Sequence, residues 1–176
     1  LANLVVMLRL AGLVAVMSDM ELVIKSAPVF GTAFLFGLIG VVYAWRGLEK
    51  QTSLAKLEVK NPTEIKTALT FGGLYAIVLV ATAWLSDIAG SSGLYTIAMV
   101  SGLTDVDAIT LSSIRLYDLH NLTADQVVTA ISLAIIANMI FKFSLVLFIA
   151  GGKLAKQCAF GMSIVALGVL IGLFIK

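Results

Sequence analysis

The sequence predicts an all-α polytopic membrane protein with about five transmembrane helices and one broken or re-entrant helical segment. Two observations lead to this fold class. Of the 176 residues, 60% are hydrophobic and only 12% are charged, which leaves too little charge to cover a soluble domain. The apolar residues also form long continuous runs without the alternation of barrel strands. The lipid bilayer is therefore the expected partner, and a net charge of +2 is too small to indicate nucleic acid.

The first two predicted spans are residues 1–17 and 28–45. The first carries Arg9 inside an apolar run and lacks an initiator methionine, so we expect it to be the second half of a longer helix. Pro28 is expected to open the second span, which ends with aromatic residues suited to a membrane interface. The polar link between the spans contains Asp19, Glu21 and Lys25.

The third span is predicted at 67–85, after the hydrophilic loop 46–66. This loop contains five basic residues, which places it on the cytoplasmic side by the positive-inside rule. The last two spans are predicted at 124–150 and 157–175, with the sequence GGKLAK turning the chain between them. Gly168 and Gly172 form a small-xxx-small pair that either brings two helices close together or reflects loose packing.

The segment 93–115 differs from the other apolar runs. As one helix it would extend about 34 Å, enough to cross a hydrocarbon core of about 30 Å. However, its middle contains Gly102, and Thr104 precedes Asp107 by three residues, as in a capping box. We therefore expect two half-helices, 94–101 and 106–115. Crossing the bilayer and returning to the same side both remain open, because both arrangements leave equal numbers of basic residues on the cytoplasmic side.

A helix break inside a membrane exposes backbone groups that must be satisfied by protein or by a water-filled cavity. Transporters use such breaks as binding sites. The predicted ion site therefore consists of oxygen-bearing side chains at the break, with the two carboxylates as metal ligands, a set compatible with Mg²⁺. Its members are Asp105, Asp107, Thr104 and Ser101.

Counter-charges at similar depth are few. Charged residues within a bilayer usually face the bundle interior and pair with one another. Lys142, with Asn138 one turn before it, is the preferred partner of Asp105 or Asp107, and Arg9 lies at a comparable depth in the first span. In the alternative interpretation Lys142 extends to the membrane surface and the aspartates only cap helices.

Four stretches in this order carry a family resemblance: NPTEIKTAL, SGLYTIAMVSGLTDVDAITLS, LTADQVVTAISLAIIANMIFK and GGKLAK. The chain resembles the uncharacterised C-terminal membrane domain attached to MgtC/SapB-like proteins of bacteria and archaea. The resemblance implies a multi-pass protein of the inner membrane that is linked to magnesium or other cation homeostasis. It implies no established activity, and the MgtC-type domain and the helices before it are absent from this sequence.

An internal repeat accompanies the resemblance. Aligning residues 5–17 with 138–150 superposes Arg9 on Lys142. Residues 1–60 would then be a partial first repeat with two spans and the cytoplasmic loop, and 61–176 a second repeat. If the segment 93–115 is re-entrant, the two repeats are inverted, as in many transporters.

The predicted function is transport of a cation, Mg²⁺ or a proton-coupled ion, at the broken helix. The alternative is a membrane regulator or adaptor that binds another membrane protein without transport. The sequence contains no nucleophile–base pair, phosphate loop or thiolate cluster, so we expect neither an enzyme nor a cofactor other than the transported cation. Expected partners are a second copy of the chain or a missing upstream membrane segment.

Overall fold

The computed structural model describes residues 2–48 and 93–176, and these residues fold into α-helices without a strand. The labelled helices are α1 (Ala2–Met17), α2 (Met20–Leu48), α4 (Val106–Asp118) and α5 (Ala124–Ile175). A further helix, Gly93–Thr104, directly precedes α4. The predicted all-α class is confirmed for this part of the chain, and the predicted span 67–85 lies outside it.

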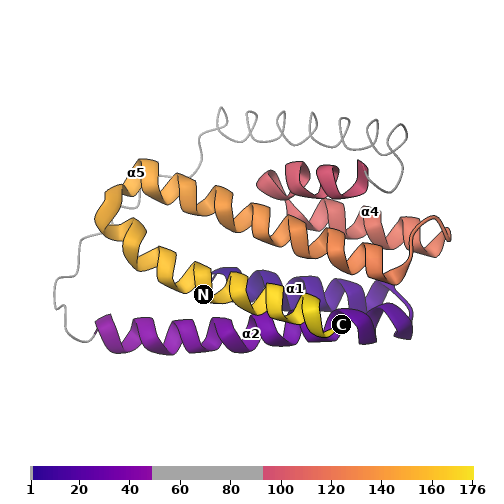
Figure 1. Ribbon diagram of the computed structural model, residues 1–176, viewed down its shortest axis with the longest axis horizontal. Coiled ribbons are helices and arrows are strands. Elements are labelled where there is room, and N and C mark those ends of the chain that lie inside the picture. Colours follow the sequence, from indigo (N-terminus) through magenta and orange to yellow (C-terminus); the bar gives the residue numbers. More distant parts are fainter. Residues whose placement is uncertain (1, 49–92) are drawn as a thin grey trace.

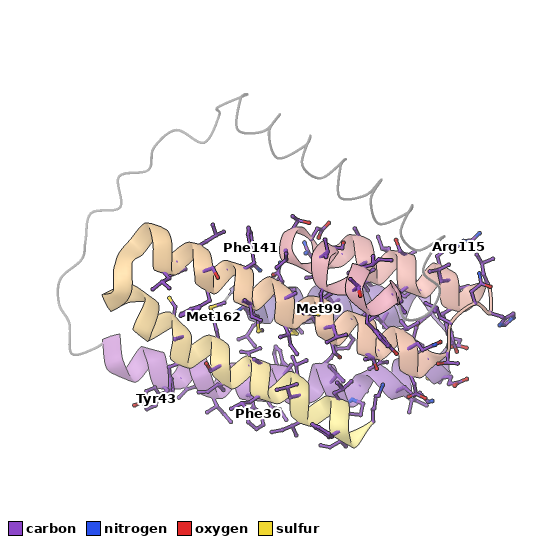
Figure 2. All side chains as sticks on the ribbon, turned by 45° about the horizontal axis from the view of Figure 1, so that its top comes forward. Phe36, Tyr43, Met99, Arg115, Phe141 and Met162 are labelled. Atoms are coloured by element: carbon purple, nitrogen blue, oxygen red, sulfur yellow. The ribbon has the colours of Figure 1, made fainter. Side chains whose placement is uncertain are left out.

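Three helical stretches are long and apolar enough to cross a membrane: Met20–Tyr43, Ala124–Leu147 and Cys158–Ile175. Large apolar side chains project from the bundle, and Phe174 remains 89% exposed. Figure 2 shows that the sticks along most of the bundle are carbon, whereas nitrogen and oxygen gather near Arg115. Such a surface is favourable in hydrocarbon and unfavourable in water. The chain is therefore a membrane protein, although five spans are not reached among the described residues.

The junction between α1 and α2 differs from the prediction. α2 begins at Met20, because the preceding Asp19 accepts a hydrogen bond from the backbone N–H of Leu22 (3.0 Å) and so caps the helix. Glu21 and Lys25, which were expected in a polar link, lie in the first turns of α2. The link is thus reduced to two residues.

Pro28 lies inside α2 and does not open it. A proline removes one backbone hydrogen bond and kinks a helix, but membrane helices tolerate it where side chains satisfy the freed groups. α2 continues through the proline to Leu48.

α5 consists of two apolar arms that fold back beside each other (Figure 1). Lys176, which caps the end of α5, confirms this arrangement, because its ammonium donates to the carbonyl oxygen of Asp125 near the start of the helix (2.9 Å). The predicted reversal between the fourth and fifth spans is present. The intervening residues are nevertheless helical, not an open turn.

The second arm of α5 packs closely on α2. A methyl group added at Gly168 would lie 2.8 Å from the Thr32 carbonyl oxygen and 2.9 Å from the Ala33 Cα, and one at Gly172 would collide with Val29. The Thr32 hydroxyl also donates to the Gly168 carbonyl oxygen (2.6 Å). The small-xxx-small pair therefore brings the two backbones together, which is the first of the two alternatives left open by the sequence.

The Gly93–Thr104 helix and α4 form a helical hairpin (Figure 1). The two helices run in opposite directions, and both outer ends lie toward the α4–α5 turn. The chain therefore reverses its direction within this segment, as the returning arrangement requires. A shared apolar core lies between the hairpin, α1, α2 and α5; its fully buried members include Leu10, Val14, Leu22, Ile109, Val127 and Ala134.

Candidate functional site

The hairpin tip, residues 101–106, contains the helix break. Asp105 alone separates the two helices, and its backbone is extended (φ −148°, ψ 124°). Its Oδ1 accepts a hydrogen bond from the backbone N–H of Asp107 (2.9 Å), so Asp105 is the N-cap of α4. The predicted break is confirmed, but the predicted capping box is wrong. Thr104 ends the preceding helix, and its hydroxyl donates to the Ser101 carbonyl oxygen (3.0 Å).

Backbone groups at the tip find partners within the protein. The last carbonyl groups of a helix lack intrahelical donors. Here the Asp105 N–H donates to the Ser101 carbonyl oxygen (2.8 Å), and the Asn138 side-chain amide donates to that of Gly102 (2.9 Å). Asn138 is 8% exposed. The amide that was expected to support the carboxylates therefore holds the hairpin backbone instead.

Gly102 allows the tip to touch the backbone of α5. A methyl group at this position would lie 2.5 Å from the Ala134 carbonyl oxygen and 2.6 Å from its Cα. Asn138 is about 21 Å along the helix from Ala124, in an arm of about 36 Å. The tip therefore reaches the middle of the apolar arm, where charged groups are costly.

Asp107 forms an ion pair with Arg9 of α1. The Arg9 Nη2 and the Asp107 Oδ2 lie 2.7 Å apart, and the two side chains are 55% and 26% exposed. The preferred pairing of Lys142 with an aspartate is therefore wrong for direct contacts, since no described carboxylate lies within 4.0 Å of Lys142. The tip contacts α5 through its backbone, which leaves Asp107 turned toward α1.

The second oxygen of Asp107, Oδ1, is buried and accepts no hydrogen bond among the described residues. The buried Ser113 hydroxyl on α4 likewise has no hydrogen-bond partner in this part of the chain. An unsatisfied buried oxygen carries a desolvation cost. A cation, a proton or a water molecule would relieve this cost at Asp107.

The predicted ligands do not share one environment. Ser101 is 1% exposed, whereas Thr104 lies on the surface of the described bundle, and Asp105 uses an oxygen to cap α4. Among residues 2–48 and 93–176 no group of three or more histidine, cysteine or acidic side chains could hold a metal ion. Asp105 and Asp107 as metal ligands remain a prediction.

Comparison with known proteins supplies the family. Residues 1–150 match a family described as a domain of unknown function, DUF4010. This chain belongs to the DUF4010 family. The match covers the α1–α2 pair, the hairpin and the first arm of α5, and hence both sides of the Arg9–Asp107 pair.

One relative is an uncharacterised protein of Aquifex aeolicus (strain VF5), 30% identical over 134 residues. The alignment covers 76% of this chain and 57% of the relative, so the DUF4010 chain spans little more than half the length of that protein. No solved structure matches this chain. The family match and this relative carry no reference to MgtC/SapB-like proteins.

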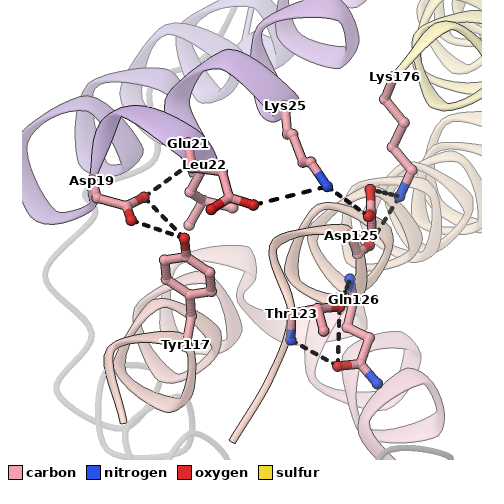
Figure 3. Close-up of polar contacts among 9 residues, drawn as sticks. All are labelled: Asp19, Glu21, Leu22, Lys25, Tyr117, Thr123, Asp125, Gln126 and Lys176. Atoms are coloured by element: carbon pink, nitrogen blue, oxygen red, sulfur yellow. Dashed lines mark hydrogen bonds and ion pairs between the residues drawn. The ribbon is translucent and has the colours of Figure 1, made fainter. Parts of the chain in front are cut away.

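A second polar cluster, not anticipated from the sequence, closes one end of the DUF4010 bundle (Figure 3). The Lys25 ammonium contacts the Asp125 Oδ2 (2.7 Å). The Lys176 ammonium lies 3.7 Å from the other oxygen of Asp125 and donates to the Thr129 hydroxyl (2.8 Å). Lys25 and Asp125 lie 100 residues apart in the sequence. Their spacing therefore does not predict that they meet.

Tyr117 ties the outer end of the hairpin to the α1–α2 junction. Its hydroxyl donates to both carboxylate oxygens of Asp19 (2.9 and 3.1 Å). Burial, followed by the hydrogen bond to Asp19, raises the pKa of Tyr117 to about 12. The phenol therefore stays protonated and able to donate at physiological pH.

Proposed function

We propose that this DUF4010 protein moves a cation across the membrane and that Asp107 is its ion-accepting group. The observation that carries the proposal is the Arg9–Asp107 pair at the tip of the helical hairpin. Broken helices at mid-bilayer depth are the typical position of substrate and ion sites in transporters. Ionisable residues within a membrane are usually functional.

The geometry supports an exchange between Arg9 and the transported ion. While the site is empty, Arg9 neutralises Asp107 and lowers the cost of holding a charge in hydrocarbon. An incoming cation or proton binds at the unpartnered Oδ1 and weakens the attraction to Arg9. The tip can then shift relative to α1, because the ion pair is its polar link to that helix.

The ion class is proposed from chemistry and resemblance. Carboxylate oxygens suit hard cations, and Mg²⁺ keeps several of its waters when a site offers few protein ligands. The resemblance to the domain attached to MgtC/SapB-like proteins supports the inner membrane of bacteria or archaea as the location. It also makes Mg²⁺ and the proton the first ions to test.

A flux assay tests the proposal. Proteoliposomes containing the purified protein would be loaded with a Mg²⁺-sensitive or a pH-sensitive dye. Asp107→Asn keeps the size of the side chain but removes its charge, and we expect it to reduce flux at least about tenfold. Asp125→Asn is the matched control, because Asp125 belongs to the polar cluster at the bundle end, and it should retain flux. Wild-type flux no faster than the leak of empty vesicles would refute transport.

The adaptor function remains the alternative, and one observation favours it. Gly31 on α2 is exposed, has no atom within 4 Å of an added methyl group, and follows the exposed Ala27 by one helical turn. This small-residue face could receive another membrane helix. Under this alternative Gly31→Leu abolishes association with a partner, whereas Asp107→Asn leaves it intact.

A further inference from the structure

A row of hydroxyl groups follows Asp107 along the inner face of α4. Thr110 and Ser113 are both 0% exposed, on a face whose other buried members are apolar. They follow Asp107 at intervals of three residues, and Tyr117 comes four residues after Ser113. Residues three and four apart are neighbours on a helix surface. Thr110, Ser113 and Tyr117 therefore form a continuous hydroxyl row that begins beside Asp107.

Both ends of this row are bound to the α1–α2 pair. Asp107 contacts Arg9 on α1 (2.7 Å), and the Tyr117 hydroxyl donates to Asp19, which directly precedes α2 (2.9 Å; Figure 3). Asp19 and Tyr117 are 98 residues apart, the same separation as that of Arg9 and Asp107. α4 therefore runs parallel to α1 and in register with it. Because Asp19 is exposed, the hydroxyl row connects the hairpin tip to the surface at the bundle end.

Ser113 differs from three other buried hydroxyl residues. The hydroxyls of Ser26, Thr110 and Ser132 each donate to a carbonyl oxygen three or four residues before them (3.1, 2.8 and 2.7 Å), a common bond in helices. Ser113 makes no such bond, although every residue of α4 is described. Its hydroxyl is therefore not engaged by its own helix.

The spacing between Asp107 and Ser113 suits a chain of hydrogen bonds. Six residues separate them along about 9 Å of the helix axis, a length that three hydrogen bonds of about 2.8 Å each can span. Thr110 lies between them, and its oxygen can still accept, because a hydroxyl has two lone pairs. The Thr110 hydroxyl and one water molecule are therefore sufficient to connect Ser113 with the buried Oδ1 of Asp107.

We infer that the ion accepted by Asp107 is a proton and that the hydroxyl row delivers it from the bundle end. This inference rests on the proposed function and selects one of its two candidate ions. Asp19 takes a proton from bulk water and passes it to Tyr117. Each oxygen of the row then accepts a proton from the side of Asp19 and releases its own toward Asp107. The new bond is the O–H bond at Asp107 Oδ1, while Asp19 and the hydroxyls end the transfer unchanged.

The burial of the row excludes Mg²⁺ from this route. Mg²⁺ loses its water molecules reluctantly and usually keeps several of them when it binds a protein. Thr110 and Ser113 are packed to 0% exposure, which leaves no width for a hydrated metal ion. A proton needs only the oxygen atoms themselves.

Hydrogen–deuterium exchange of a thiol tests the row without measuring flux. Cys158 is the single cysteine of the sequence, so Ser113→Cys in a Cys158→Ser background carries one S–H group, whose infrared band shifts on deuteration. After transfer of proteoliposomes to D₂O, we expect this band to exchange at least about tenfold faster than that of Ser132→Cys. Ser132 is the matched control, because it is also 0% exposed but bonds to its own helix. Equal exchange rates at the two positions would overturn the inference, whether or not the protein transports an ion.

Proton flux in the proteoliposome assay tests delivery to Asp107. Ser113→Ala and Thr110→Val remove a hydroxyl with little change in size, and we expect each to reduce proton flux at least about tenfold. Thr110→Ser keeps the hydroxyl and should retain the flux, as should Ser132→Ala. Ser113→Ala removes a buried hydroxyl that is not bound to its own helix, so the thermal unfolding midpoint should not fall. A loss of flux in this variant is then not a loss of folding.

Failure of this inference and failure of transport give different results. If the wild type moves neither ion, the proposed function is refuted, and the thiol exchange alone decides whether the row carries protons. Mg²⁺ flux without proton flux would overturn the inference and leave transport standing. Unchanged proton flux in Ser113→Ala would have the same meaning.

Discussion

Asp105 and Asp107 stand two residues apart in the chain and have different roles. Asp105 accepts the Asp107 N–H and caps α4, a role that a neutral oxygen-bearing side chain can also fill. Asp107 instead pairs its charge with Arg9. Among the described residues, Asp107 is therefore the carboxylate whose charge is committed to an ion pair at the tip.

A double-mutant cycle measures the Arg9–Asp107 pair. Arg9→Gln or Asp107→Asn alone leaves one charge without its partner. The stability losses of the two single variants should therefore add up to more than the loss of the double variant. Because Arg9 is 55% exposed, we expect a coupling of only about 1 kcal/mol, measured by thermal unfolding in detergent. Lys142→Gln combined with Asp107→Asn is the control and should show little coupling. Coupling equal to that of Arg9 would contradict the observed pairing.

Tyr117 gives the bundle end a dependence on alkaline pH. Burial and Asp19 raise the pKa of Tyr117 to about 12. A phenol in an unfolded chain has a pKa of about 10, so the stabilisation is fully present below pH 10 and is lost as the pH rises through 12. The phenolate absorbance of Tyr117, assigned as the part that Tyr117→Phe removes, should appear near pH 12. Asp19→Asn should shift the midpoint of this absorbance change toward pH 10. An unshifted titration in Asp19→Asn would show that this contact is absent.

The helical hairpin depends on the contact between its tip and the backbone of α5. Asn138 satisfies the Gly102 carbonyl oxygen, and Gly102 itself leaves no room for a larger residue beside Ala134. The hairpin is thus positioned by one glycine and one amide. A substitution at either residue should act on the whole hairpin.

Gly102→Ala tests the close approach of the hairpin. Its methyl group would lie 2.5 Å from the Ala134 carbonyl oxygen, so the hairpin must move away. We expect a loss of about 1–3 kcal/mol in thermal unfolding experiments. Gly31→Ala is the matched control: that glycine is also helical but has open space around it, and alanine should be neutral or stabilising by up to about 1 kcal/mol. Equal effects of the two substitutions would argue against the contact.

At the scale of the whole molecule, the sequence predicts how deep a charged residue lies in the membrane better than it predicts which neighbouring helix that residue faces. Gly102 and the nearby polar residues were sufficient to predict the break, because each disfavours an uninterrupted apolar helix. Arg9 and Lys142 both have a suitable depth, but the pairing depends on which way the tip faces. That direction follows from the Gly102–Ala134 contact, which no local pattern encodes.

The same limit explains the errors at the ends of helices. Pro28 suggested a helix start, whereas the side-chain cap is Asp19 and the apolar pattern already begins at Met20. The polar cluster around Asp125 depends on the return of α5 to its own beginning. Such contacts arise only when distant segments meet.

Labelling from the two sides of the membrane tests the returning path of the hairpin. In a Cys158→Ser background, a membrane-impermeant maleimide should label Thr96→Cys and Leu119→Cys from the same side. All three positions chosen for labelling, 96, 119 and 43, are exposed in the described bundle. Tyr43→Cys, near the opposite end of α2, should react from the other side. Labelling of positions 96 and 119 from opposite sides would show a crossing helix.

The division of roles at the tip has a consequence for evolution. A cap requires only an oxygen that accepts the Asp107 N–H, so position 105 is expected to drift among aspartate, asparagine, serine and threonine in the DUF4010 family. Position 107 lacks this freedom, because a change there leaves the Arg9 guanidinium unmatched in the bilayer. Family members that lose the acid at 107 should also lose the base at 9, as a correlated pair of changes.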